Sequence, residues 1–210
     1  MCFSTEVSFI AALSLGVIGT LTLKKTSSSK QYFLASIPFL FALQQLSEGF
    51  IWLHLKEGIG SEGLLTFSKS YFLTFAFLVW PICIPLTFAS LDPIKWRRIL
   101  LLINLVCGVT LSLLNFIYAL QQEAIVKIVN HSIQYIGNIP SQNLLYPLIV
   151  ILPTFLSSLR NVWIYGVFAI TGLLVANYYY FQTFTSVWCF FAAVISLFIY
   201  KIVKHPDHRD

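Results

Sequence analysis

Long apolar runs separated by short polar breaks repeat along nearly the full length of this chain. A helix that crosses a membrane needs about 20 consecutive, mostly apolar residues, and seven stretches meet that requirement. The predicted spans are 4–23, 31–55, 64–90, 99–120, 143–159, 162–180 and 184–203. The pattern therefore predicts an all-α integral membrane bundle of seven transmembrane helices, forming a single domain over residues 1–210.

Two of these spans contain helix-breaking residues. The third span holds Pro81 and Pro85, and proline removes a backbone donor and displaces the preceding turn. We therefore expect a kink there, tolerated because neighbouring helices can bond to the freed carbonyl groups. The fifth span is short and holds Pro147 and Pro153, so its boundaries are the least well defined.

Composition supports the same class. Hydrophobic residues make up 58% of the chain and charged residues only 10%, whereas a soluble domain carries about 25% charged residues. The net charge of +5 comes from Lys and Arg in the short connections. If the N-terminus lies outside, the cytoplasmic set is Lys24, Lys25, Lys30, Lys95, Arg97, Arg98, Arg160, Lys201, Lys204 and Arg209. The outer set is Lys56, Lys69 and Lys127.

This unequal distribution predicts an outside N-terminus and a cytoplasmic C-terminus, because positive residues favour the cytoplasmic side. It also explains the net charge without nucleic acid as a partner, and leaves the lipid bilayer as the expected one. One long connection, residues 121–142, then lies outside. Apolar residues in it recur at helical spacing, which predicts an amphipathic helix at about 124–136 in the outer interface.

Glu48 is the acidic residue well inside a predicted span, and an ionisable group there costs at least a few kcal/mol. Gln44, Gln45 and Trp52 lie three or four residues from it, so they share its helix face. A costly carboxyl group among amides makes this face the main candidate for a ligand or proton site. Structural helix–helix contacts by the two glutamines are the alternative.

Lys69 lies about as far as Glu48 from the centre of the connection between the second and third spans. With a rise of about 1.5 Å per residue, both side chains are expected at the same depth, which predicts an ion pair between them. The ion pair would either be part of the ligand or proton site or act only as a structural contact between the two helices. In a third interpretation, Lys69 extends to the outer interface and leaves Glu48 protonated.

His131 in the outer loop is either an exposed interfacial histidine or part of the same site. Cys2 and Cys189 both belong to the outer half, where they could form a disulfide, act as thiols in a site, or remain unlinked. The candidate metal ligands are Glu48, His131, Cys2 and Cys189. The spacing of the cysteines contains no metal-binding motif.

Four separated motifs give the chain a resemblance to an uncharacterised bacterial family of small polytopic membrane proteins. The motifs are Met1-Cys2-Phe3-Ser4, Gln44-Gln45-x-x-Glu48-Gly49-x-x-Trp52, His131-Ser132-Ile133-x-Tyr135 and Ser186-Val187-Trp188-Cys189-Phe190-Phe191-Ala192-Ala193. The resemblance implies a seven-helix protein of a bacterial inner membrane and carries no activity. All four motifs project toward the outer half of the membrane, which suggests one pocket. Its expected lining is Cys2, Ser4, Gln44, Gln45, Glu48, Trp52, His131, Tyr135, Ser186, Trp188 and Cys189.

Three functional classes fit these features. The leading hypothesis is a protein that binds or transports a small ligand or proton through Glu48. The second is a membrane-embedded, metal-dependent hydrolase, which alone would require zinc. Its seven-helix plan looks like that of alkaline ceramidases, but the last span lacks their histidine pair. The third is a sensor or assembly protein without chemistry of its own. The sequence itself requires no cofactor and favours a role other than catalysis.

Overall fold

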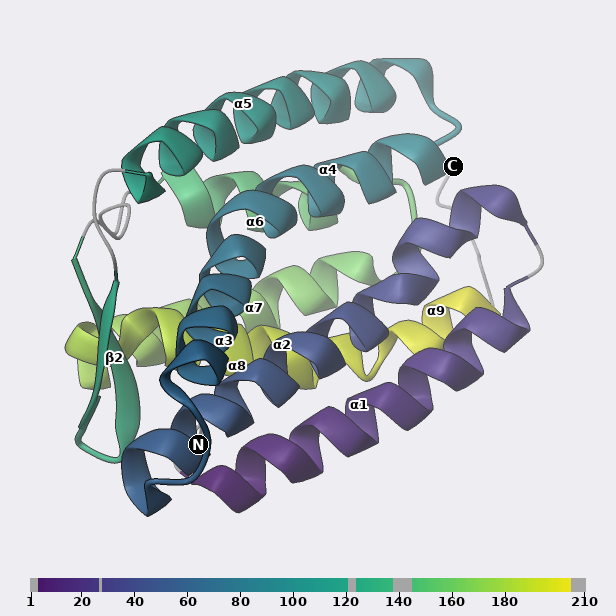
Figure 1. Cartoon of the computed structure of the whole chain (residues 1–210). Coiled ribbons are helices and arrows are strands. Elements are labelled where there is room, and N and C mark those ends of the chain that lie inside the picture. The colour runs from purple at the N-terminus through teal and green to yellow at the C-terminus, as the bar shows by residue number, and fades with distance from the viewer. Residues whose placement is uncertain (1–3, 27, 121–123, 138–144, 205–210) are drawn as a thin grey trace.

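The computed structural model describes residues 4–26, 28–120, 124–137 and 145–204. Within them, six helical segments are long and apolar enough to cross a membrane. These segments are Thr5–Lys25, Ser29–Glu57, Glu62–Leu91, Lys95–Ala119, Val162–Tyr179 and Phe181–Val203. A shorter apolar helix, α6 (Leu145–Leu156), takes the place of the fifth predicted span. The predicted all-α membrane bundle of seven helical segments is confirmed (Figure 1).

Some spans consist of more than one helix. The remaining helices are α1 (Thr5–Lys25), α2 (Tyr32–Glu57), α3 (Glu62–Thr74), α4 (Trp80–Leu91), α5 (Lys95–Ala119), α7 (Val162–Tyr179), α8 (Phe184–Ser196) and α9 (Ile199–Lys204). Short 3-10 turns at Ser29–Gln31 and Phe181–Thr183 precede α2 and α8. The third span is built from α3 and α4, and the last from α8 and α9.

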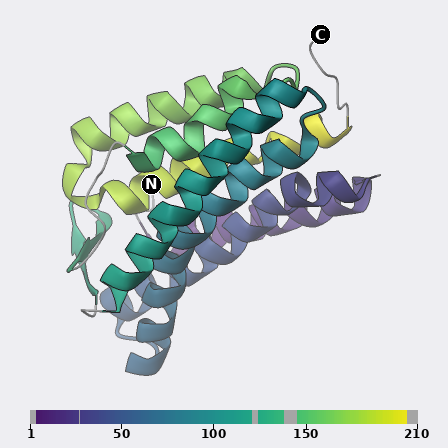
Figure 2. The same cartoon turned by 90° about the horizontal axis from the view of Figure 1, so that it is seen from above.

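Helix α2 lies at the centre of the bundle. It contacts α1, α3, α4, α8 and α9, and buried residues cover most of its circumference, while Phe39 and Leu46 lie on a partly exposed face. A broad buried face of this kind is stable when several helices pack against it. By contrast, α1, α5 and α7 bury much less of their length. In Figures 1 and 2 α5 runs along the outside of the bundle. Polar groups on α2 are therefore held away from both lipid and water.

The third span bends where its prolines predict. Residues Phe75–Val79, just before Pro81, form a π-helical turn. Since Pro81 has no N–H, the carbonyl group of Phe77 loses its ordinary helical partner. Asn115 of α5 replaces it, with Nδ2 donating to Phe77 O at 3.0 Å, and the Ser112 hydroxyl donates to the next carbonyl, also at 3.0 Å. The kink is thus stabilised by its neighbour.

Helix α5 also approaches the carbonyl group freed by the second proline of this span. Pro85 leaves Pro81 O without its helical donor, and Gly108 packs directly on that oxygen. A Cβ atom at Gly108 would lie 1.9 Å from Pro81 O, so the close contact requires glycine. Because Gly108, Ser112 and Asn115 recur at helical spacing, one stripe of α5 complements the backbone of the kinked helix.

Replacing this glycine tests the contact. We expect Gly108→Ala to lower the stability of the purified protein by about 2 kcal/mol or more, because the added methyl group meets backbone rather than a movable side chain. Gly63→Ala is the matched control, since its nearest neighbour would be Ser61 Oγ at 3.8 Å. Thermal unfolding in mild detergent measures both. Equal melting temperatures for the two variants would contradict this account of α5.

The outer loop is a β-hairpin, so the predicted amphipathic helix at about 124–136 is wrong. Strand β1 (Ile125–Val129) pairs antiparallel with β2 (Ser132–Ile136). Asn130 and His131 form the turn with φ values of 46° and 57°. A two-residue turn with both φ values positive matches the twist of paired strands, and asparagine adopts it readily. β-Branched residues and a turn signal therefore outweighed the helical spacing of the apolar positions.

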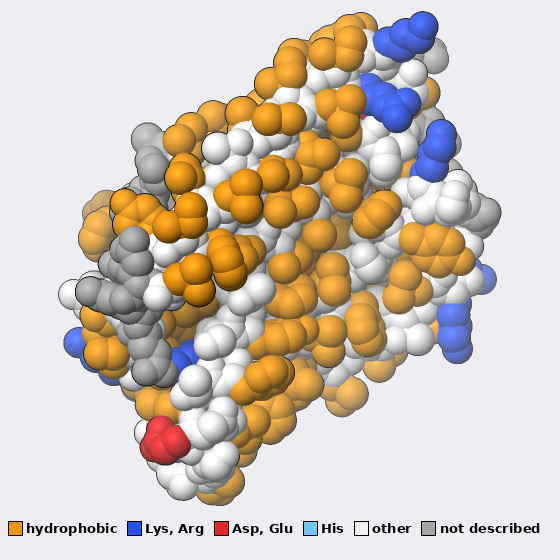
Figure 3. Space-filling model, turned by 45° about the horizontal axis from the view of Figure 1, so that its top comes forward, with side chains coloured by type: hydrophobic (Ala, Val, Ile, Leu, Met, Phe, Trp, Pro, Cys, Tyr) orange, Lys and Arg blue, Asp and Glu red, His pale blue; other side chains and the backbone are white. Residues whose placement is uncertain are grey.

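Positive charge gathers mainly at the opposite end of the bundle from this hairpin (Figure 3). The connections α1–α2, α4–α5 and α6–α7 all lie there (Figure 1). A buried carboxylate that sequence reasoning did not single out joins two of them. Asp92 Oδ2 accepts from the backbone N–H of Ser158 at 2.6 Å, and Oδ1 accepts from that of Ile94 at 3.0 Å. Asp92 thus fixes the α6–α7 connection against the start of α5.

Candidate functional site

The carboxyl group of Glu48 lies inside the protein, between α2 and α8, and its side chain is fully buried. Its Oε1 atom accepts a hydrogen bond from the Ser186 hydroxyl group of α8. Its Oε2 atom accepts a longer one, 3.5 Å, from Gln45 Nε2 on its own helix. Ser186 belongs to the first turn of α8. The partial positive charge of a helix N-terminus favours negative charge at this place.

Gln44 connects the same region to the kinked third span. Its Oε1 atom accepts from Trp80 Nε1 at 2.9 Å, and its Nε2 atom donates to the carbonyl oxygen of Phe72 at 3.5 Å. Both partners are buried. Trp80 is further fixed by stacking on Phe41, with ring centroids 4.0 Å apart. The amide group of Gln44 is therefore positioned on both sides by α3 and α4.

The contact between Gln44 and Phe72 also defines the relative depth of α2 and α3. Glu48 lies one helical turn outward from Gln44, and Ser68 and Lys69 lie one turn outward from Phe72. The expectation that Lys69 and Glu48 share one depth agrees with this register. The ion pair between Glu48 and Lys69 stays a prediction. Nearer the connection between α2 and α3, His54 Nε2 lies 3.3 Å from Glu62 Oε1.

Cys189 lies one turn below Ser186 on α8 and within interaction range of Gln44 and Glu48. It belongs to a buried cluster that also contains Trp52, Phe72, Ile133 and Tyr135. Tyr135 of the hairpin stacks on Phe72 with ring centroids 4.9 Å apart. The hairpin thus packs on the outer side of the Glu48 region. Three of the four motifs, those of α2, β2 and α8, therefore meet, as the sequence suggested.

The other predicted site residues lie elsewhere. Ser4 caps α1 by accepting from the backbone N–H of Val7 at 3.3 Å. His131 is exposed at the tip of the hairpin, so it is not placed beside Glu48. Cys189 has a free thiol group, while Cys2 lies outside the described residues. No group of three or more potential metal ligands occurs in the described part of the chain. The zinc set considered for a hydrolase is therefore not assembled there.

Several buried polar atoms around Glu48 have no hydrogen-bond partner within the structure described. They include Gln45 Oε1, Trp52 Nε1 and Ser68 Oγ, and each of these side chains is at least nine-tenths buried. Buried polar groups in proteins are almost always hydrogen-bonded, to protein, water or ligand. These atoms therefore mark the region between α2 and α3 as one with capacity to bind water or a small polar group.

A pocket of about 720 Å³ opens beneath the hairpin, next to this region. Its walls come from the bend of the third span, strand β2, and the outer ends of α6, α7 and α8. Trp188 and Cys189 form the part of the wall nearest to Gln44 and Glu48. Tyr146 of α6 packs edge-on against Trp188, with ring centroids 5.4 Å apart. The site therefore combines a buried carboxyl group with an adjacent, partly open pocket.

Trp80, Ser68 and Tyr146 contribute to this region but were not predicted. Each is a residue type common in membrane helices, and the partners of Trp80 and Tyr146 lie far away in the sequence. Pro81, directly after Trp80, was the one local signal in the sequence, because it predicted the kink beside which the π-helical turn forms.

Fold and site together define a helical integral membrane protein with a buried carboxyl group beside a pocket beneath the hairpin. A comparison with known protein families identifies the family to which it belongs. The family described as "Family of unknown function (DUF6629)" matches residues 1–210, so the chain belongs to that family. This agrees with the resemblance to an uncharacterised family found in the sequence. No curated protein and no solved structure matches the chain.

The Gln44–Trp80 hydrogen bond can be measured by a double-mutant cycle. We expect Gln44→Leu and Trp80→Phe each to lower the stability by about 1–3 kcal/mol, because each leaves a buried polar group unpaired. The double variant should lose less than the sum, with a coupling energy of at least about 0.5 kcal/mol. Unfolding in detergent provides all four values. Additive losses would show that the bond does not couple α2 to α4.

Proposed function

We propose that this protein binds a small molecule in the pocket beneath the β-hairpin, with Glu48 as the group that exchanges a proton or a hydrogen bond with it. The observation that carries the proposal is the position of Glu48, fully buried on the central helix yet adjacent to the pocket wall at Cys189. A structural role alone would not require an open space of about 720 Å³ next to a carboxyl group.

The physical argument rests on the medium around Glu48. A carboxyl group at such depth costs a few kcal/mol or more, and it is retained where it binds a proton or a partner. Ser186 and Gln45 each contact one of its oxygen atoms. Both oxygen atoms of Glu48 are therefore held in place for directional hydrogen bonding. The unpartnered atoms Trp52 Nε1 and Ser68 Oγ offer further contacts for water or ligand. Together they support selective binding, and transport if the ligand also leaves on the other side.

We further propose that the pocket faces the outside of a bacterial inner membrane. The support is the excess of Lys and Arg in the connections opposite the hairpin, since such residues favour the cytoplasm. A fluorescent-protein fusion at the C-terminus should therefore fluoresce, because the commonly used green variant matures in the cytoplasm. A dark C-terminal fusion of well-expressed protein would reverse the proposed orientation.

The function is tested by replacing Glu48 with its neutral isostere. We expect Glu48→Gln to fold and to lose a carboxyl band that the wild type shows in infrared difference spectra between acidic and alkaline conditions. Native mass spectrometry of the purified protein should show, in the same variant, loss of the small molecules that the wild type retains. Both effects follow from removing the group that exchanges the proton.

Glu57→Gln is the matched control, because Glu57 lies on the same helix at its exposed end. Its Oε1 atom accepts from Thr5, a contact that glutamine can keep. The control should lose at most the band of an exposed carboxyl group and keep the bound molecules. If Glu48→Gln retains the same small molecules as the wild type and loses no carboxyl band, Glu48 has a structural role and the proposed function is wrong.

A further inference from the structure

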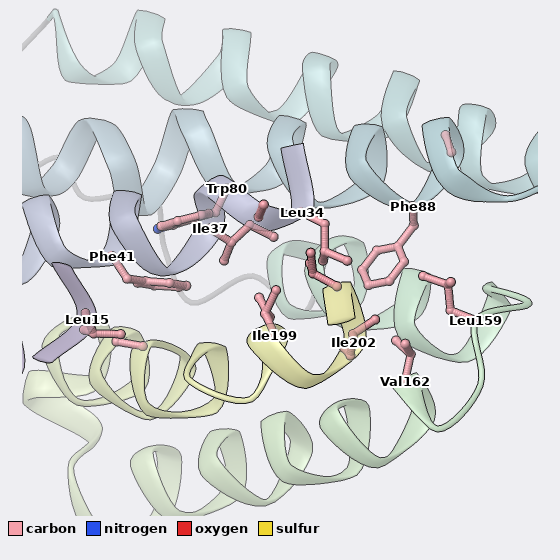
Figure 4. Packing of buried hydrophobic residues seen from close by; sticks show 14 of the residues in the cluster. Leu15, Leu34, Ile37, Phe41, Trp80, Phe88, Leu159, Val162, Ile199 and Ile202 are labelled. Atoms are coloured by element: carbon pink, nitrogen blue, oxygen red, sulfur yellow. The ribbon is translucent and has the colours of Figure 1, made fainter. Parts of the chain in front are cut away.

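A second space lies deeper in the bundle than the outer pocket. It has a volume of about 130 Å³ and is lined by side chains of α2, α4, α6, α7, α8 and α9. Figure 4 shows part of its wall, including Leu34, Ile37, Phe88, Val162 and Ile202. An apolar cavity of similar size in another protein stays dry and binds benzene, so this space suits one hydrocarbon group.

The two aliphatic hydroxyl groups in this wall are already satisfied. Thr154 Oγ1 donates to the carbonyl oxygen of Ile151 at 2.7 Å, and Ser196 Oγ donates to that of Ala193 at 2.6 Å. Both bonds lie within a single helix. Neither hydroxyl group is therefore free to donate a hydrogen bond to a molecule in the cavity. The cavity consequently favours an apolar group.

The two spaces meet at one wall. Tyr146, Trp188 and Cys189 line both the deep cavity and the outer pocket. Beyond this wall the lining becomes polar, with Gln134 of the hairpin and Asn177 of α7 on the pocket side. The site is thus apolar at its inner end and polar at its outer end.

The shared wall also carries a donor. Trp188 Nε1 is buried and has no hydrogen-bond partner in the part of the chain that the structure describes. A buried N–H group without a partner is stabilised when a ligand supplies a hydrogen-bond acceptor to it. Neither lining contains Lys or Arg among its described residues, so an anionic group would lack a counter-ion there.

We propose that the ligand is a single-chain amphiphile with an uncharged head that carries an accepting oxygen. One end of its hydrocarbon part, about the size of a six-membered ring, occupies the deep cavity. The remainder and the head lie in the larger outer pocket, where the oxygen accepts a hydrogen bond from Trp188 Nε1. The inference rests on the proposed function and names the chemical class of its ligand. Such molecules partition into the bilayer, so the membrane itself supplies them.

Retinol, a fluorescent single-chain alcohol, is the probe. Its emission is titrated with the wild-type protein in nanodiscs, and empty nanodiscs provide the blank. We expect saturable binding that Ala192→Phe weakens at least tenfold, because Ala192 lines the deep cavity and the new ring fills it. Ala119→Phe adds the same ring at the exposed end of α5 and should bind as the wild type does.

Trp188→Phe keeps an aromatic ring in the wall but removes the donor, so we expect binding about fivefold weaker, as for loss of one hydrogen bond. Ala169→Leu, on the α7 side of the cavity, is a second and milder filling variant in case Ala192→Phe does not fold. It should also weaken binding. Wild-type protein that fails to bind retinol above the blank, or filling variants that bind it normally, would overturn the inference.

Failure of this inference and failure of the proposed function give different results. If retinol does not bind but Glu48→Gln still loses its carboxyl band and its retained molecules, only the amphiphile class is wrong. If retinol binds through the cavity while Glu48→Gln behaves as the wild type does, the ligand class stands and the role of Glu48 is wrong.

Discussion

The fold depends on keeping one carboxyl group inside a membrane. Glu48 is tolerable only because neighbouring helices cover its face of α2, where they exclude lipid and supply hydrogen-bond partners. Ser186 donates a hydrogen bond to Glu48 from the first turn of α8. The 3-10 turn that precedes α8 sets the position at which this first turn begins. The central position of α2 and the entry of α8 are consequences of the same requirement.

The kinked third span and the straight helix α5 contribute differently to the position of Gln44 and Glu48. The bend before Pro81 brings Trp80 toward Gln44, while α5 satisfies the carbonyl group that the bend exposes. Because Asn115 and Gly108 meet backbone atoms, this contact depends on main-chain geometry and leaves little freedom to the bend. The rigid side of the protein is thus α4 with α5, and it positions one edge of the site.

Sequence patterns predicted what depends on length, hydropathy and local spacing. The spans, the kink at Pro81 and the shared face of Gln44 and Glu48 all follow from rules that act within about one or two helical turns. The hairpin was missed because its β-branched residues also recur at helical spacing, and the Asn130 turn was the deciding signal. Partners such as Trp80 could not be predicted, because their contacts depend on how distant helices pack.

Buried polar groups in this molecule differ in whether another part of the chain satisfies them. Along α5 and in the deep cavity, polar side chains such as Asn115 and Thr154 are bonded to backbone carbonyl groups. Around Glu48, donors such as Trp52 Nε1 and Trp188 Nε1 are buried with no partner in the described structure. Asn104 Oδ1 and Arg97 Nε of α5 also have no partner there, so unpaired atoms are not confined to the Glu48 region. The donors at Trp52 and Trp188 are the groups to which the proposed ligand, or ordered water, would bond.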